Sequence, residues 1–132
     1  MQWFYIASGN SHKSQEFNSL FGEKKILGVK NSSQKFDVVE DGKTFNENAY
    51  KKAEFYYHKL KQPVLSDDSG LVVTALPGEL RIHSARFGGS GLDDASRCDL
   101  LLEKLDGVSD RSAYFVCVLC FYLGPKEVFF FE

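Results

Sequence analysis

Two adjacent carboxylates, Asp67 and Asp68, are the side chains of this sequence best placed to do chemistry. They follow Pro63-Val64-Leu65, which is typical of a short buried strand, and acid at that point serves a reaction or a cation. A second apolar run, Leu71-Val72-Val73, comes afterwards, so Ser69-Gly70 is predicted to be a tight link between two strands. Successive strand side chains point to opposite faces, so at most one of the carboxylates can serve a given cleft. A turn whose side chains bond only nearby backbone is the alternative, and this segment alone does not decide between them.

A candidate anion site lies earlier in the chain, between the first predicted strand and the first predicted helix. Residues 3–7 are apolar, and helical spacing of apolar residues begins after residue 16. The intervening segment, Ser8 to Lys13, offers backbone N–H, hydroxyl, amide and ammonium groups at a helix N-terminus, which favours phosphate. The segment lacks the spacing of a Walker loop, and a plain helix cap by Asn10 or Ser11 explains it equally well.

Glu40 is the best candidate for a second carboxylate. The segment Thr44-Phe45-Asn46-Glu47 is a capping box, and apolar residues recur at three- and four-residue steps from there to Leu60, which predicts a helix. Glu47 is therefore expected to cap that helix. Glu40 precedes the helix at the end of an extended segment, where it could approach Asp68 across neighbouring strand ends.

Composition limits the class of partner. The chain has 132 residues, of which 43% are hydrophobic, and it carries a net charge of −2. This length fits one domain over residues 1–132 with its own core. This net charge gives no indication of a basic surface that would bind nucleic acid, and no apolar run reaches the roughly 20 residues that a membrane-spanning helix needs. The first residues lack the features of a signal peptide, so we expect a cytoplasmic protein with a small-molecule partner.

Two other reactive groups are set aside. Cys117 and Cys120 form a C-x-x-C, but they lie in a segment with strand composition, so their side chains should face opposite ways rather than share a zinc ion. His83 has no nucleophile paired with it, which argues against a Ser-His hydrolase. Arg81 and Arg86, in the same segment as His83, could face phosphate.

Four segments of the chain, in order and spacing, resemble the motifs of the inosine/xanthosine triphosphate pyrophosphatase family. The resemblance extends from residue 3 to about residue 123. The segments are Ser8-Gly9-Asn10-x-x-Lys13-x-x-Glu16, Glu40-x-Gly42-x-Thr44-Phe45-x-Glu47-Asn48-Ala49-x-x-Lys52-Ala53, Asp67-Asp68-Ser69-Gly70-Leu71 and Ser84-Ala85-Arg86-Phe87.

This resemblance implies a fold and a reaction. The fold is α/β, with a mixed twisted sheet flanked by helices around a central cleft, usually in a homodimer. The reaction is the Mg²⁺-dependent hydrolysis of deaminated purine nucleoside triphosphates (ITP, dITP and XTP) to the monophosphate and pyrophosphate, which removes them from the nucleotide pool.

The resemblance also implies roles for individual residues. By position, Asp68 would be the catalytic base, and Glu40 and Asp68 would hold the metal. A triphosphate brings about three or four negative charges toward these carboxylates, so a divalent cation between them is needed, and Mg²⁺ prefers oxygen ligands. The substrate-binding residues would be Ser8, Gly9, Asn10, Ser11, His12, Lys13 and Ser69, with Lys52 and Arg86 as further phosphate contacts.

Two departures from the family pattern lead to further expectations. Leu80-Arg81-Ile82-His83 stands where the family has a Pro-Gly and a Tyr, and the Phe-Gly-Tyr-Asp and Ser-His-Arg segments that grip the purine do not occur. We therefore expect a truncated form that holds mainly the phosphate and metal half of the site. The aromatic segment Val128 to Phe131 is expected to need a covering partner or further chain. The alternatives are a catalytically idle paralogue that binds nucleotide or dimerises, and a related pyrophosphatase for other modified nucleotides.

Overall fold

A computed structural model describes residues 2–8, 11–22, 27–31, 36 and 38–132. The chain forms two compact units, one of residues 1–68 and 118–132 and the other of residues 69–117. The prediction of one domain over residues 1–132 stays a prediction. Within the described ranges, no helix is long and apolar enough to cross a membrane.

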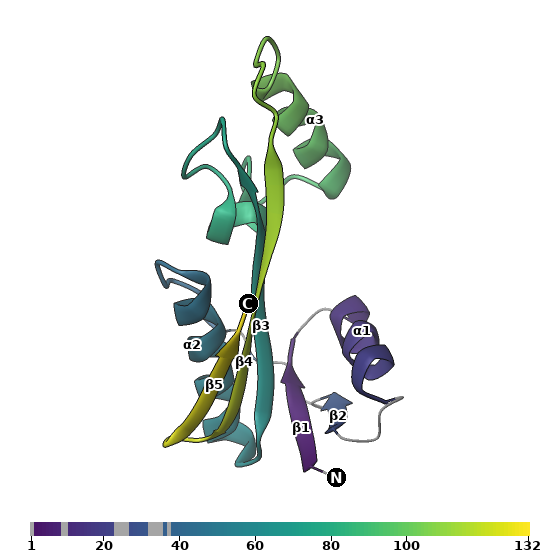
Figure 1. Cartoon of the computed structure of the whole chain (residues 1–132), viewed down its shortest axis with the longest axis vertical. Coiled ribbons are helices and arrows are strands. Elements are labelled where there is room, and N and C mark those ends of the chain that lie inside the picture. Colours follow the sequence, from purple (N-terminus) through teal and green to yellow (C-terminus); the bar gives the residue numbers. More distant parts are fainter. Residues whose placement is uncertain (1, 9–10, 23–26, 32–35, 37) are drawn as a thin grey trace. The chain divides into compact units, whose positions relative to one another are not determined.

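The strands form one mixed sheet in the order β2-β1-β3-β4-β5 (Figure 1). The strand pairs described next lie in the first unit. Strand β1 pairs in parallel with β2 and with the start of β3, whereas β4 and β5 form an antiparallel hairpin. The predicted α/β class with a mixed sheet and flanking helices is confirmed. The elements are β1 (Gln2–Ala7), α1 (Ser11–Gly22), β2 (Leu27–Asn31), α2 (Phe45–Leu60), β3 (Val64–Val73), β4 (Ala113–Gly124) and β5 (Glu127–Phe131).

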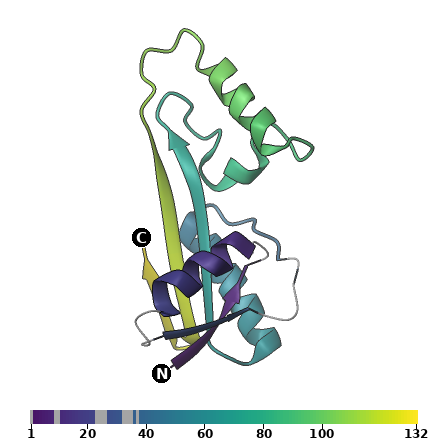
Figure 2. The same cartoon turned by 90° about the vertical axis from the view of Figure 1, so that its right-hand side faces the viewer.

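Helices α1 and α2 cover opposite faces of this sheet, as Figures 1 and 2 show. On the α1 face, Phe17 joins Phe4, Ile6 and Leu65 in one buried apolar cluster. On the α2 face, aromatic rings of the helix pack against Tyr122, which is 1% exposed. The central strands β1 and β3 thus have buried residues between the two helices, whereas β5 is largely exposed.

Helix α2 follows its sequence pattern closely. Thr44 is the N-cap and accepts a hydrogen bond from the Glu47 backbone N–H at 3.1 Å, while the Glu47 carboxylate accepts one from the Lys43 N–H at 2.7 Å. The predicted N-cap is thus confirmed, and Glu47 supports the start of the helix, but its carboxylate bonds the N–H of Lys43 rather than that of the N-cap residue as in a capping box. Of the apolar residues at helical spacing, Phe45, Ala49, Ala53 and Tyr56 are buried, whereas Leu60 is partly exposed.

The second unit contains the end of β3, the start of β4, the 3₁₀ helix η1 (Arg81–Arg86) and the helix α3 (Asp94–Lys104). Its core is a cluster of Val73, Leu80, Phe87 and Leu105. Asp93 is the N-cap of α3, and its Oδ1 accepts a hydrogen bond from the Ser96 N–H at 2.7 Å.

The predicted break at Ser69-Gly70 is wrong, because β3 runs without interruption from Val64 to Val73. Gly70 is present for a different reason. A Cβ on Gly70 would lie 2.1 Å from the backbone oxygen of Arg81, so only glycine allows that close approach. In the segment after residue 34, the described residues 36, 38 and 39 are not in a strand.

Candidate active site

Lys13, at the end of the predicted phosphate loop, lies beside Asp67, one of the two predicted carboxylates. Strands β1 and β3 are parallel, and Ala7 is the register partner of Ser66. Ser8 follows the end of β1, and Asp67 follows Ser66 within β3, just past the last register pair of the two strands. Two predicted substrate contacts, Gly9 and Asn10, lie outside the described residues, as does the side chain of Ser11.

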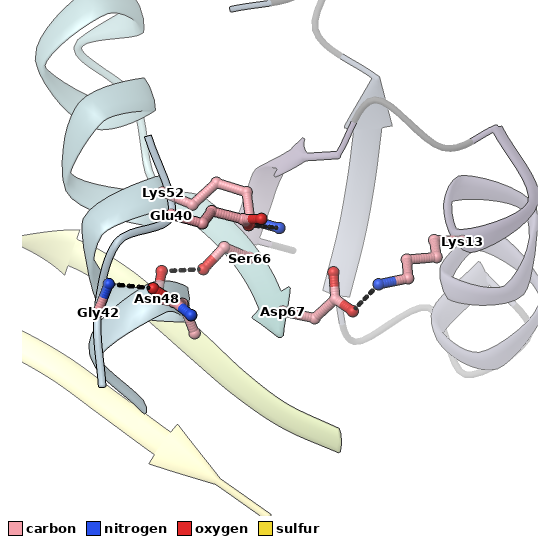
Figure 3. A network of polar contacts seen from close by, with 8 residues as sticks. Lys13, Glu40, Gly42, Asn48, Lys52, Ser66 and Asp67 are labelled. Carbon is pink, nitrogen blue, oxygen red and sulfur yellow. Dashed lines mark hydrogen bonds and ion pairs between the residues drawn. The ribbon is translucent and has the colours of Figure 1, made fainter. Parts of the chain in front are cut away.

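Asp67 and Asp68 point to opposite faces of the sheet, as predicted from strand alternation. Asp67 lies on the α1 face, where its Oδ2 is 2.5 Å from Lys13 Nζ. Ser66 and Asp68 lie on the α2 face, where Ser66 Oγ donates to the Ala49 carbonyl at 2.6 Å (Figure 3) and Asp68 is hydrogen-bonded to the Asn48 side chain. The two carboxylates therefore have different partners and different environments.

Asp68 is held in an environment that favours its protonated form. The residue is 8% exposed, and burial is the main cause that raises its pKa above the ordinary value of 3.8. The hydrogen bond from Asn48 works against this increase, and the negative charge of Glu40 adds to it. A carboxylate with a raised pKa is a stronger base at neutral pH than an exposed one.

Glu40 and Lys52 form an ion pair beside Asp68. Lys52 Nζ lies 2.8 Å from Glu40 Oε1, and the lysine side chain is 16% exposed (Figure 3). Both charges act on the pKa of Asp68, Glu40 raising it and Lys52 lowering it. The structure thus brings together Glu40, Asp68 and Lys52, three residues that sequence reasoning proposed for the site.

Asn48 is a member of this site that sequence reasoning did not propose. Its Oδ1 accepts a hydrogen bond from the Gly42 N–H at 2.7 Å, and its side chain also bonds to Asp68. A Cβ on Gly42 would lie 2.6 Å from that oxygen, so the segment that carries Glu40 can approach the helix only with glycine at position 42. The sequence did not single out Asn48, because this residue adjoins a helical capping motif. Asn48 is nevertheless buried and polar, and this combination marks a site.

Two carboxylate oxygens of the site are buried without a hydrogen bond. They are Asp67 Oδ1 and Asp68 Oδ2, which have no hydrogen-bond partner within the described part of the chain. A buried unpaired carboxylate oxygen is costly unless a cation or a donor reaches it. The donor set at Asp68 and Glu40 therefore fits a hard cation such as Mg²⁺.

The second unit carries two further proposed residues, Ser69 and Arg86. Arg86 Nη2 lies 3.3 Å from His83 Nδ1, and both side chains are exposed. Ser84 Oγ donates to the Arg81 carbonyl at 2.6 Å and accepts from the Leu71 N–H at 2.9 Å, which ties η1 to β3. The proposed contacts of Ser69 and Arg86 with substrate stay predictions.

Comparisons with known proteins agree on one family. The Ham1 family model matches residues 4–132. A dITP/XTP pyrophosphatase from Treponema pallidum (strain Nichols) is 48% identical over 122 residues, which are 91% of this chain and 45% of that protein. One from Staphylococcus epidermidis (strain ATCC 12228) is 42% identical over 119 residues, covering 90% of this chain and 61% of that protein. This chain thus spans about half of the length of the curated relatives it matches.

Solved structures give the same result. The Ham1 protein of Staphylococcus aureus has a TM-score of 0.84 and 39% identity, and the comparison covers 98% of this chain and 68% of that one. A HAM1 protein from Coxiella burnetii has a TM-score of 0.88 and 32% identity, with the same coverage.

Proposed function

This chain belongs to the Ham1 family, and we propose on that premise that it hydrolyses deaminated purine nucleoside triphosphates, namely ITP, dITP and XTP, to the monophosphate and pyrophosphate. The relatives named dITP/XTP pyrophosphatase support this substrate class. The role would be to remove these nucleotides from the nucleotide pool.

One observation carries the proposal. Asp68 is buried with its Oδ2 unpaired within the described residues, close enough to Glu40 and Lys52 for both charges to shift its pKa. A buried carboxylate with a raised pKa beside a second carboxylate and a cation is an arrangement found at hydrolytic sites.

The metal we propose is Mg²⁺, held by Glu40 and Asp68. Among the described residues, no three His, Cys, Asp or Glu side chains form a group that could hold a metal ion. Mg²⁺ commonly takes one or two protein carboxylates and completes its shell with substrate phosphates and water, so two carboxylates would suffice. When bound, Mg²⁺ would neutralise phosphate charge and polarise the phosphorus under attack.

The residues of the chain would divide the remaining work. Asp68 would orient the attacking water and accept its proton, because a positioned carboxylate can act as a general base. Lys13 and Lys52 would bind the triphosphate as positive charges, each of them beside a carboxylate that limits its motion. Ser69 and Arg86 would supply further contacts, and the segment Ser8 to His12 would supply backbone and side-chain donors to phosphate.

A homodimer and a cytoplasmic location belong to the same proposal. The family resemblance implies the homodimer. The cytoplasm follows from the substrate, because the nucleoside triphosphate pool is there.

The proposal is tested by a nucleotide screen. The 132-residue chain is incubated with ITP, dITP, XTP, ATP and GTP, with and without Mg²⁺, and pyrophosphate release is measured. Asp68→Asn is the matched control, because it removes one charge at nearly constant shape. We expect Mg²⁺-dependent release from ITP, dITP and XTP that Asp68→Asn abolishes.

Each contrary result of the screen has a definite meaning. Turnover of other modified nucleotides but not of ITP would assign the chain to a different pyrophosphatase activity. Binding of nucleotide without turnover, in a folded chain with Mg²⁺ present, would refute the proposed hydrolysis.

A further inference from the structure

The contact between Lys13 and Asp67 joins the predicted phosphate loop to the carboxylate pair. Lys13 is in the first turn of α1 and Asp67 is in β3, and Lys13 Nζ lies 2.5 Å from Asp67 Oδ2 (Figure 3). The Asp67 side chain is 3% exposed, whereas that of Lys13 is 30% exposed. One partner is thus fixed in the interior and the other reaches the surface.

The position of Asp67 argues against a direct part in the reaction. Asp67 faces α1, whereas Asp68 and its partners Asn48 and Glu40 belong to the α2 side of the strand. A base must reach the water that attacks the substrate, and the groups that fit a metal lie with Asp68. The role of Asp67 must therefore be sought in its contact with Lys13.

A buried carboxylate on a central strand is a rigid anchor for a lysine. The lysine side chain has many rotamers, and fixing them costs free energy when a ligand binds. An ammonium group carries three donors, more than one carboxylate oxygen uses at a time. Lys13 can therefore keep its contact with Asp67 while it also donates to a phosphate oxygen.

We propose that Asp67 is a positioning residue that holds the Lys13 ammonium at the polyphosphate subsite. The inference rests on the proposed function, because that function places a triphosphate at Lys13. Asp67 acts through Lys13 and touches no substrate atom. Its contribution is to binding of the polyphosphate rather than to the chemical step.

The test is equilibrium binding of Mg²⁺-tripolyphosphate, followed by calorimetry with the 132-residue chain. The variants are Asp67→Asn, Lys13→Met and the double variant. Glu79→Gln and Lys104→Met are the matched controls, since they break another lysine–carboxylate pair, with an N–O distance of 3.0 Å, far along the sequence. Thermal unfolding of each variant shows that it is folded.

We expect Asp67→Asn to raise Kd by about tenfold, because Lys13 loses its fixed position. Lys13→Met should raise Kd at least as much, and the double variant should bind like Lys13→Met alone, because Asp67 acts only through that lysine. The two control variants should keep the wild-type Kd.

Several outcomes would overturn the inference. They are a wild-type Kd in Asp67→Asn, losses that add in the double variant, and a wild-type chain that does not bind tripolyphosphate. A collapse of kcat in Asp67→Asn at unchanged KM would make Asp67 a catalytic residue instead. If neither Asp67→Asn nor the smaller Asp67→Ser folds, Asp67 is needed for folding and the inference fails.

The binding readout separates this inference from the proposed function. Tripolyphosphate binding needs no turnover. A chain that binds tripolyphosphate with the expected variant pattern but hydrolyses no nucleotide would support the role of Asp67 and refute only the proposed hydrolysis.

Discussion

Lys52 Nζ lies 2.8 Å from Glu40 Oε1, so a carboxylate that we propose for the metal is already paired with a cation. The ammonium competes with Mg²⁺ for the Glu40 oxygen, and it can also bind phosphate once a nucleotide arrives. Lys52 should therefore oppose binding of the metal alone and favour binding of the metal with nucleotide.

Replacement of Lys52 by methionine separates these two effects. Lys52→Met should strengthen Mg²⁺ binding without nucleotide by roughly three- to tenfold, since one nearby positive charge is lost, and should raise KM for ITP. Calorimetry with Mg²⁺ measures the affinity for the metal, and steady-state kinetics measure KM for ITP. The control is Lys51→Met, at the residue next to Lys52, which breaks an exposed ion pair with Asp41. It should change neither the affinity for Mg²⁺ nor KM for ITP. Weaker Mg²⁺ binding in Lys52→Met would show that Lys52 orders Glu40 for the metal instead.

Asp68→Asn should lower kcat for ITP by about 10²- to 10⁴-fold, the contribution expected of a positioned base. The shape of the side chain is kept, so the variant should fold. Initial rates at saturating ITP and Mg²⁺ give the comparison. A variant that keeps more than about a tenth of the wild-type rate would mean that another group takes the proton.

The raised pKa of Asp68 also predicts how stability depends on pH without added metal. Burial, and to a smaller extent the charge of Glu40, keep the folded-state proton on Asp68 at pH values where the unfolded chain has lost it. The folded state then binds more protons, so this residue makes the unfolding free energy fall as pH rises from about 3.8 through the raised pKa. Urea unfolding across pH should show this fall in the wild type and a smaller one in Asp68→Asn. If the unfolding free energy of the wild type and that of Asp68→Asn changed with pH in parallel, this prediction would be contradicted.

Gly42→Ala should disturb the site through packing alone. The added Cβ would lie 2.6 Å from Asn48 Oδ1 and 2.8 Å from Glu47 Cβ, so the turn before α2 must move. We expect a loss of about 1–3 kcal/mol in unfolding free energy, together with lower activity. Gly91→Ala is the control, because a Cβ there meets nothing within 4 Å. Equal stability of the two variants would contradict the packing argument.

The cysteines should differ in reactivity. Cys98 and Cys117 are exposed, whereas Cys120 is buried and its burial raises its pKa to about 11. At pH 8, a thiol reagent such as Ellman's should modify two thiols quickly and the third only after unfolding, because the thiolate is the reactive form. Cys98→Ser should leave one fast thiol. Three fast thiols in the folded wild type would show that β4 does not protect Cys120.

The sequence predicted the site residues where local rules act alone. Strand alternation placed Asp67 and Asp68 on opposite faces, and the capping box set the start of α2 at Phe45, as the structure has them. Both depend only on short-range geometry. The partner of Asp67 could not be found in this way, because Lys13 is 54 residues away in the sequence.

Gly70 shows where sequence reasoning failed. Glycine after a polar pair usually marks a turn, and this led to a predicted break in a strand that is continuous. Its actual cause is the approach of the Arg81 backbone, a tertiary contact that no local pattern contains. Asn48 was missed for the same reason, because its two partners, Gly42 and Asp68, meet only in the fold.

The measurement that tests the central claim most directly is the identity of the products. Phosphorus NMR of ITP incubated with the 132-residue chain and Mg²⁺ distinguishes cleavage between the α- and β-phosphates from loss of the terminal phosphate. We predict IMP and pyrophosphate in equal amounts, formed by Asp68→Asn at roughly one-hundredth of the wild-type rate or less. Formation of IDP and orthophosphate, or product formation by Asp68→Asn at more than about a tenth of the wild-type rate, would contradict the site proposed here.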